Sequence, residues 1–216
     1  MTVIRQDDLI DSVADALQFI SYYHPVDFVK AVHEAYEKEQ NQAAKDAMAQ
    51  ILINSRMCAE GHRPICQDTG IVTVFLKIGM NVQWDSEMSV ADMVNEGVRR
   101  AYTHPDNVLR ASILEDPAGA RKNTRDNTPA VIHYEVVEGD TVDVQVAAKG
   151  GGSENKSKMV KLNPSDSIVD WVVKTVPTMG ARWCPPGMLG IGIGGTAEKA
   201  AVQSKEAFMD PNDINS

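Results

Sequence analysis

Three consecutive side chains, Cys66, Gln67 and Asp68, could serve a chemical site within the stretch Gly61–Gly70 (G-H-R-P-I-C-Q-D-T-G). A thiol that can act as a soft ligand, an amide and a carboxylate are together costly to bury without partners. A β-prone run begins at Ile71, so we expect the three side chains on a loop that leads into a strand, where reactive groups are often presented. The alternative is that the cysteine is a small buried hydrophobe.

A second stretch, Lys149–Lys158 (K-G-G-G-S-E-N-K-S-K), follows another β-prone run. Its three glycines add no packing, but they let backbone N–H groups approach an anion closely. Hydroxyl, amide and ammonium donors follow, although the spacing is not that of a P-loop. The stretch is therefore either an anion-binding loop or a flexible, solvated one.

A third stretch places Cys184 between Trp183 and two prolines. The prolines fix the backbone and remove two amide donors, which makes a metal or cluster ligand plausible on a rigid loop. A buried thiol before a strand is the alternative.

The fourth stretch, Asn107–Thr128, is a polar segment with little periodicity, and loops of this length are more often functional than idle. It contains Arg110, Arg121 and Arg125, and an arginine fork can hold one carboxylate of a dicarboxylate. A salt-bridged surface loop is the alternative.

The elements that must position these loops follow from hydrophobic periodicity. We expect helices near residues 9–20, 28–36, 44–61, 89–102, 165–176 and 197–208, and a strand near 71–80. Ala130–Val137 and Thr141–Ala148 are expected to form a hairpin turned at Glu138-Gly139-Asp140. The pattern predicts an α+β fold, with a mixed-sheet α/β arrangement as the variant, in a single domain over residues 1–216: N-terminal helices, then a sheet with flanking helices.

Composition narrows the classes of protein. Lys plus Arg is 21 and Asp plus Glu is 30, a net charge of −9 without a basic stripe, so nucleic acid is not the expected partner. No long apolar run predicts a membrane span, and the N-terminus does not resemble a signal peptide. The three widely spaced cysteines favour reduced thiols and a cytoplasmic location. The histidines show no zinc-ligand spacing, and no G-x-S-x-G suggests a serine hydrolase.

Taken together, four motifs resemble those of the iron–sulfur (class I) fumarate hydratases in order and spacing. They are P-I-C-Q-D-T-G, R-K-N-T-R-D-N-T-P-A, A-A-K-G-G-G-S-E-N-K-S and W-C-P-P-G followed by G-I-G-G-T-A-E-K-A. Tartrate dehydratase α subunits share weaker versions of the same motifs and are the nearest rival.

The resemblance implies a 4Fe–4S cluster held by three cysteines, with one iron open to substrate. It assigns ligand roles to Cys66 and Cys184 and expects the third cysteine beyond residue 216, so that the chain would be the N-terminal part of a longer enzyme. Cys58 matches no family ligand and is expected to pack.

The resemblance also implies a substrate site and a reaction. Asp68, beside Cys66, would be the general acid and base, and Arg110 with the Lys149–Lys158 loop would hold the distal carboxylate. The implied substrate contacts are Gln67, Asp68, Arg110, Gly150, Ser153, Glu154, Asn155, Lys156, Ser157, Lys158 and Met159.

The implied reaction is the reversible hydration of fumarate to (S)-malate, as in the tricarboxylic acid cycle, by a homodimer. The alternatives are an L-tartrate dehydratase α chain and a non-catalytic α-type subunit or binding module that needs a partner chain.

Overall fold

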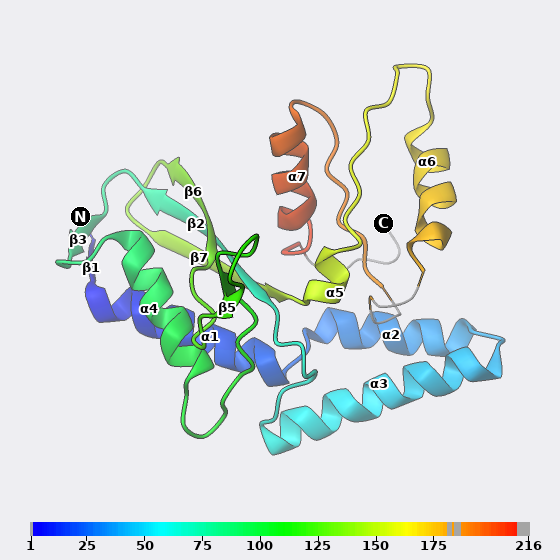
Figure 1. Cartoon of the computed structure of the whole chain (residues 1–216), viewed down its shortest axis with the longest axis horizontal. Coiled ribbons are helices and arrows are strands. Elements are labelled where there is room, and N and C mark those ends of the chain that lie inside the picture. Colours follow the sequence, from blue (N-terminus) through cyan, green and yellow to red (C-terminus); the bar gives the residue numbers. More distant parts are fainter. Residues whose placement is uncertain (1, 181–182, 184–186, 211–216) are drawn as a thin grey trace. The chain divides into compact units, whose positions relative to one another are not determined.

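The computed structural model describes residues 2–180, 183 and 187–210, and its helices and small sheets confirm the α+β prediction (Figure 1). The chain divides into two compact units, the first ending at Lys149 and the second covering Gly150–Asp210. The assignment of residues 1–216 to a single functional domain stays a prediction.

The first unit begins with a short strand and three helices. They are β1 (Val3–Arg5), α1 (Gln6–Tyr22), α2 (Val26–Lys38) and α3 (Gln42–Gly61). The α1 helix starts before residue 9, where its apolar spacing begins, and the Asp8 carboxylate accepts the backbone N–H of Arg5. The gap between α1 and α2 and the end of α3 at Gly61 fall where the sequence predicts them. Asn41 caps α3 by accepting the N–H groups of Ala43 and Ala44.

The main sheet has three strands in the order β6-β2-β7. Its members are β2 (Ile71–Gly79), β6 (Val131–Val137) and β7 (Val142–Lys149). The central β2 strand runs parallel to β6 and antiparallel to β7. Continuous apolar character along β2 suits this central position, because both of its faces are covered.

The predicted hairpin of β6 with β7 is therefore wrong, since β2 lies between the two strands. The connection that follows β6 wraps around the end of β2: the N–H of Gly79 donates to Thr141 O, and that of Asn81 donates to Gly139 O. A Cβ on Gly79 would lie 2.6 Å from Gly139 O, so a glycine is needed where the chain passes this closely. The short connection indicated pairing, but the apolar β2 strand takes the central place.

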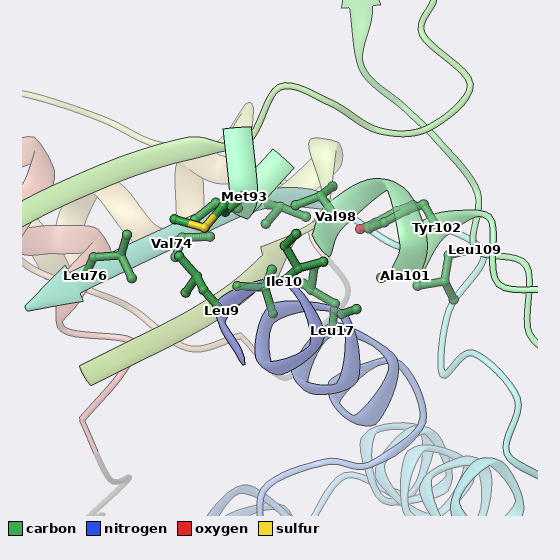
Figure 2. Packing of buried hydrophobic residues seen from close by; sticks show 14 residues of the cluster. Leu9, Ile10, Leu17, Val74, Leu76, Met93, Val98, Ala101, Tyr102 and Leu109 are labelled. Carbon is green, nitrogen blue, oxygen red and sulfur yellow. The ribbon is translucent and has the colours of Figure 1, made fainter. Parts of the chain in front are cut away.

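The hydrophobic core of this unit lies between the sheet and two helices, α1 and α4 (Val90–Tyr102) (Figure 2). From β2 come Val72, Val74 and Leu76, and the two helices supply most of the rest of the cluster. A Cβ on Gly97 of α4 would meet Ile10 O at 2.7 Å, so the missing side chain lets α4 approach α1 closely. Ser89 caps α4 through the N–H of Asp92, as its place in the sequence predicts.

Two small pairs of strands were not predicted. The first is β1 with β3 (Gln83–Asp85), in parallel. The second lies within the polar Asn107–Thr128 stretch, where β4 (Leu114–Glu115) pairs with β5 (Lys122–Asn123). Elements of two or three residues carry too little periodicity to be read from a sequence.

The described residues of the second unit form four short helical elements: α5 (Gly151–Glu154), α6 (Ile168–Thr175), the 3₁₀ helix η1 (Val176–Met179) and α7 (Ala197–Glu206). The Gly-rich stretch after β7, predicted as a loop, thus includes one helical turn. Ser167 caps α6 by accepting the N–H of Asp170. The Gly-spaced apolar residues 188–193 form no strand. Within the described ranges, no helix is both long and apolar enough to cross a membrane.

Candidate functional site

The approach to Cys66 is fixed before the cysteine is reached. After α3, His62 adopts a left-handed conformation, and its ring stacks on Tyr22. The N–H of Ile65 then donates a 2.8 Å hydrogen bond to Ser21 O, and the amide of Asn54 donates a 3.0 Å bond to Ile65 O. The loop therefore enters the site from a backbone tied to both α1 and α3.

The exit of the loop is fixed as well. The Tyr102 hydroxyl donates a 2.6 Å hydrogen bond to Thr69 O, and the amide of Asn127 donates a 3.0 Å bond to Gly70 O. Gly70 has a φ of +88°, and a Cβ there would lie 2.6 Å from the backbone carbon of Ala148. Only glycine suits this position. Cys66, Gln67 and Asp68 consequently lie on a short span with anchors on both sides.

The three candidate side chains lie close together on this span. Cys66 is a free, half-buried cysteine. Its sulfur accepts the backbone N–H of Asp68 at 3.5 Å and lies 3.3 Å from Gln67 Oε1. The N–H of Gly70 donates to Asp68 Oδ1 at 3.3 Å. The sulfur of Cys66 is thus faced by a backbone N–H of the same short span.

Tyr102, at the end of α4, donates from a buried hydroxyl whose pKa is raised. Burial raises the pKa of the Tyr102 hydroxyl well above its ordinary value, and the negative charge of Asp68 raises this pKa further, against the lowering effect of the bond to Thr69. The hydroxyl therefore stays protonated and remains a donor at physiological pH.

Arg110 is joined to the Cys66 loop through the backbone. The Thr69 hydroxyl donates a 2.6 Å hydrogen bond to Arg110 O. The Arg110 side chain is exposed and forms no ion pair with any residue that the structure describes. Arg121 instead donates to Pro117 O, and both Arg121 and Arg125 occupy left-handed turn positions. Of the three arginines, Arg110 is thus the one with a direct bond to the loop.

In the second unit, the Gly-rich stretch contacts the segment that leads to Cys184. Ser153 Oγ donates to Trp183 O at 3.4 Å, and Lys156 Nζ donates to Met179 O at 2.6 Å. Glu154 pairs with Lys205 on α7 at 2.7 Å. Three predicted substrate contacts therefore also have structural roles in this unit.

The other predicted contacts in this stretch differ in exposure. Gly150 is half-buried and precedes the first turn of α5. The exposed residues are Asn155, Ser157, Lys158 and Met159. Cys184 lies outside the described residues. Within the second unit, the Gly-rich stretch thus contacts the segment before Cys184. Within the first unit, the Cys66 loop contacts the polar Asn107–Thr128 stretch.

Cys58 packs as expected. It is buried, and its sulfur lies 3.7 Å from both Asn54 Oδ1 and Pro64 O. Among the described residues, no group of three His, Cys, Asp or Glu side chains could hold a metal ion. Cys66 fits the role of one ligand in a larger set, because its sulfur is reduced, accessible and faced by a backbone N–H.

The sequence did not predict the backbone hydrogen bonds that Tyr102 and Asn127 make in this region. The spacing of α4 places Tyr102 near the apolar face, but no pattern predicts that its hydroxyl reaches residue 69. Asn127 carries a weak signal, since a stretch rich in Asn, Asp and Thr is typical of side chains that hydrogen-bond the backbone.

Comparisons with known proteins identify the family of the chain. The model of the family described as "Fumarate hydratase (Fumerase)" matches residues 10–216. The chain belongs to this family. It is therefore a member of the iron–sulfur hydro-lyases, as the four motifs indicated.

Curated relatives cover nearly the whole chain. A putative L(+)-tartrate dehydratase subunit alpha of Methanocaldococcus jannaschii is 35% identical over 206 residues, which are 92% of this chain and 71% of that protein. The L(+)-tartrate dehydratase subunit alpha of Escherichia coli strain UTI89 is 28% identical over 94% of this chain and 67% of its own length. The protein of that name from strain K12 is 27% identical.

Proposed function

We propose that this member of the fumarate hydratase family is the catalytic chain of an iron–sulfur hydro-lyase that adds water reversibly to fumarate to give (S)-malate. The observation that carries the proposal is the connection of Cys66 and Asp68 to Arg110 through Thr69. A ligand thiol, a carboxylate and an exposed cation then serve one small dicarboxylate.

L-tartrate is the second candidate substrate, because the relatives compared are named tartrate dehydratase α subunits. The same names support a partner chain or a further region that completes the enzyme. Tartrate carries a hydroxyl on each of its two central carbons, so the second hydroxyl needs a donor or acceptor that fumarate does not. Gln67, with an exposed amide beside Asp68, is the described side chain best suited to supply it.

In the proposed mechanism, Cys66 and Cys184 would be two of the three thiolate ligands of a 4Fe–4S cluster. Such a cluster would supply a Lewis acid for the substrate oxygens. One central carbon of the substrate gains or loses hydroxide. Asp68 transfers the proton at the adjacent carbon.

The remaining residues bind and orient. The Arg110 guanidinium offers a fork to one carboxylate. As the family resemblance implies, backbone N–H groups and exposed side chains of residues 150–159 would be further substrate contacts, and Gln67 would contribute its amide. Ser153, Glu154 and Lys156 act there mainly by fixing the shape of the stretch, because their described partners are protein groups.

The test is anaerobic reconstitution of the full chain with iron and sulfide, together with any partner chain that its genetic locus encodes. Cys66→Ala is expected to abolish the cluster absorbance and the hydration of fumarate. Cys58→Ala is the matched control and should retain both, since Cys58 packs in the protein. Retention of cluster and activity in Cys66→Ala contradicts the proposal.

Assays on fumarate, (S)-malate and L-tartrate then separate the two candidate substrates. If L-tartrate is turned over faster than fumarate and (S)-malate, dehydration of L-tartrate replaces fumarate hydration as the proposed reaction. If none of the three compounds is converted, with or without a partner chain, the remaining assignment is a non-catalytic subunit or binding module.

A further inference from the structure

The stretch Asn123–Thr128 was expected to contribute cations to the site, yet its side chains are mostly directed at the backbone. Asn123 donates to Ala111 O at 2.9 Å and accepts the N–H of Arg125 at 2.7 Å. Asn127 accepts the N–H of Ser112 at 2.7 Å. The stretch thereby holds the backbone that follows Arg110.

Asn127 is the residue that links this stretch to the Cys66 loop. Its side chain is completely buried, and its amide nitrogen donates to Gly70 O while its amide oxygen accepts from Ser112. The residue has a φ of +62°, a conformation that asparagine tolerates better than most residues. One buried amide therefore joins the backbone at 70 and at 112, and both of its polar atoms are satisfied.

Tyr102 reaches the same place from α4. It is 1% exposed, and its hydroxyl lies 2.6 Å from Thr69 O and 3.3 Å from Gly70 O. Two buried donors thus hold the two consecutive carbonyl groups that follow Asp68. Neither donor is accessible to a substrate, so neither is a catalytic residue.

We propose that Asn127 and Tyr102 are positioning residues, which set the Asp68 carboxylate relative to Arg110 by fixing the carbonyl groups of Thr69 and Gly70. The catalytic part of this inference rests on the proposed hydro-lyase function. The Thr69 hydroxyl completes the connection, because it donates to Arg110 O. Displacement of the carbonyl groups would move the acid/base group and the cation together.

Two variants test the inference. Asn127→Asp keeps the size of the side chain and the acceptor for Ser112, but it replaces the donor to Gly70 O by a repelling oxygen. Tyr102→Phe removes one hydroxyl and keeps the ring. Asn123→Asp is the matched control, because it makes the same chemical change but removes a donor to Ala111 O, away from residues 69 and 70.

The first readout does not depend on a cluster or a substrate. The rate at which iodoacetamide alkylates Cys66 in the cluster-free full chain is measured by peptide mass spectrometry, with buried Cys58 as the internal reference. We expect Asn127→Asp and Tyr102→Phe to raise the Cys66 rate by about fivefold or more at constant Cys58 rate, because half-buried thiols react faster when their loop opens. Asn123→Asp should leave the ratio unchanged. A parallel rise at both cysteines indicates global destabilisation and overturns the inference.

The second readout is the split between kcat and KM in the reconstituted enzyme. The two variants are expected to lower kcat by about tenfold with a smaller change in KM, since misplacement of an acid/base group weakens the transition state most. Wild-type kcat together with a wild-type Cys66 rate overturns the inference and leaves the proposed function intact. If the wild-type enzyme is inactive, the proposed function is refuted. A Cys66 alkylation rate that still rises in the variants, at constant Cys58 rate, would then support the positioning of the loop independently of that function.

Discussion

The hydroxyl group of Thr69 donates a 2.6 Å hydrogen bond to the backbone carbonyl of Arg110, across 41 positions of the chain. Thr69 follows Asp68 directly, and the Arg110 side chain is exposed. One short bond therefore joins the residue after Asp68 to the backbone of Arg110, whose side chain is the proposed carboxylate-binding cation. The Cys66 loop and the segment that contains Arg110 are thereby linked in the first unit.

Replacement of Thr69 by valine tests that bond. Thr69→Val keeps the shape of the side chain and removes the hydroxyl, so the backbone of Arg110 loses one fixed contact worth about 1 kcal/mol. We expect KM for the dicarboxylate to rise by about fivefold, with a smaller loss in kcat. Thr103→Val is the control, because it removes an equivalent bond to Arg99 O at the end of α4. Equal KM values in the two variants would contradict the role of Thr69.

Gly70→Ala is expected to destabilise the first unit strongly. The left-handed backbone at φ +88° costs an alanine about 1–3 kcal/mol, and its Cβ would also overlap the backbone of Ala148. Gly139→Ala is the matched control, since Gly139 also has a positive φ, of +112°, but no atom within 4 Å of its Cβ position. Urea denaturation should give Gly70→Ala a lower free energy of unfolding than Gly139→Ala by at least about 1 kcal/mol. Equal free energies of unfolding for the two variants would show that the backbone near Ala148 shifts enough to accommodate the added Cβ.

The sequence was sufficient to predict features that depend on neighbouring residues. The helices carry regular apolar spacing, and β2 carries a continuous apolar run, so both were predicted within a few residues. Cys66 and Asp68 are separated by a single residue, so their proximity required no tertiary information. The packing of Cys58 also followed from its place at the end of a helix.

Features that depend on distant residues were missed for a physical reason. The bonds from Tyr102 to Thr69 and from Asn127 to Gly70 span 33 and 57 positions. Neither is encoded in periodicity, because a hydroxyl or an amide on a buried face can meet many partners. The hairpin prediction failed similarly, since a short connection indicates pairing but cannot show that a third strand enters between its arms.

The acid stability of the first unit should depend on Asp126. Burial alone would raise the pKa of this carboxyl, but hydrogen bonds from Thr128 and the charge and bond of Arg99 outweigh it and lower the pKa below its ordinary value. A lowered pKa contributes stability that is present above the unfolded-state pKa and is lost as the pH falls through the folded-state pKa. Asp126→Asn should therefore flatten the decline in the free energy of unfolding between about pH 5 and pH 2.

The measurement is urea denaturation of the wild type and Asp126→Asn at several pH values in this window. Asp106→Asn is the control, because it alters an exposed carboxylate shortly after α4. Its free energy of unfolding should change with pH as that of the wild type does. If the free energy of unfolding of Asp126→Asn fell with decreasing pH as steeply as that of the wild type, the carboxylate would contribute nothing to acid stability.

Two lysines of the Gly-rich stretch should have separable roles. Lys156 is half-buried and donates a 2.6 Å hydrogen bond to Met179 O, in the segment that leads to Cys184, whereas Lys158 is exposed. Lys156→Met is expected to weaken iron binding after anaerobic reconstitution by about tenfold, because a charged hydrogen bond that shapes the ligand segment is lost. Lys158→Met should keep its iron and raise KM for the dicarboxylate, because it removes only a cation available to the substrate. Iron per chain, titrated with a chelator, and initial rates distinguish the two effects. Full iron binding by Lys156→Met, with a raised KM, would instead make Lys156 a direct substrate contact.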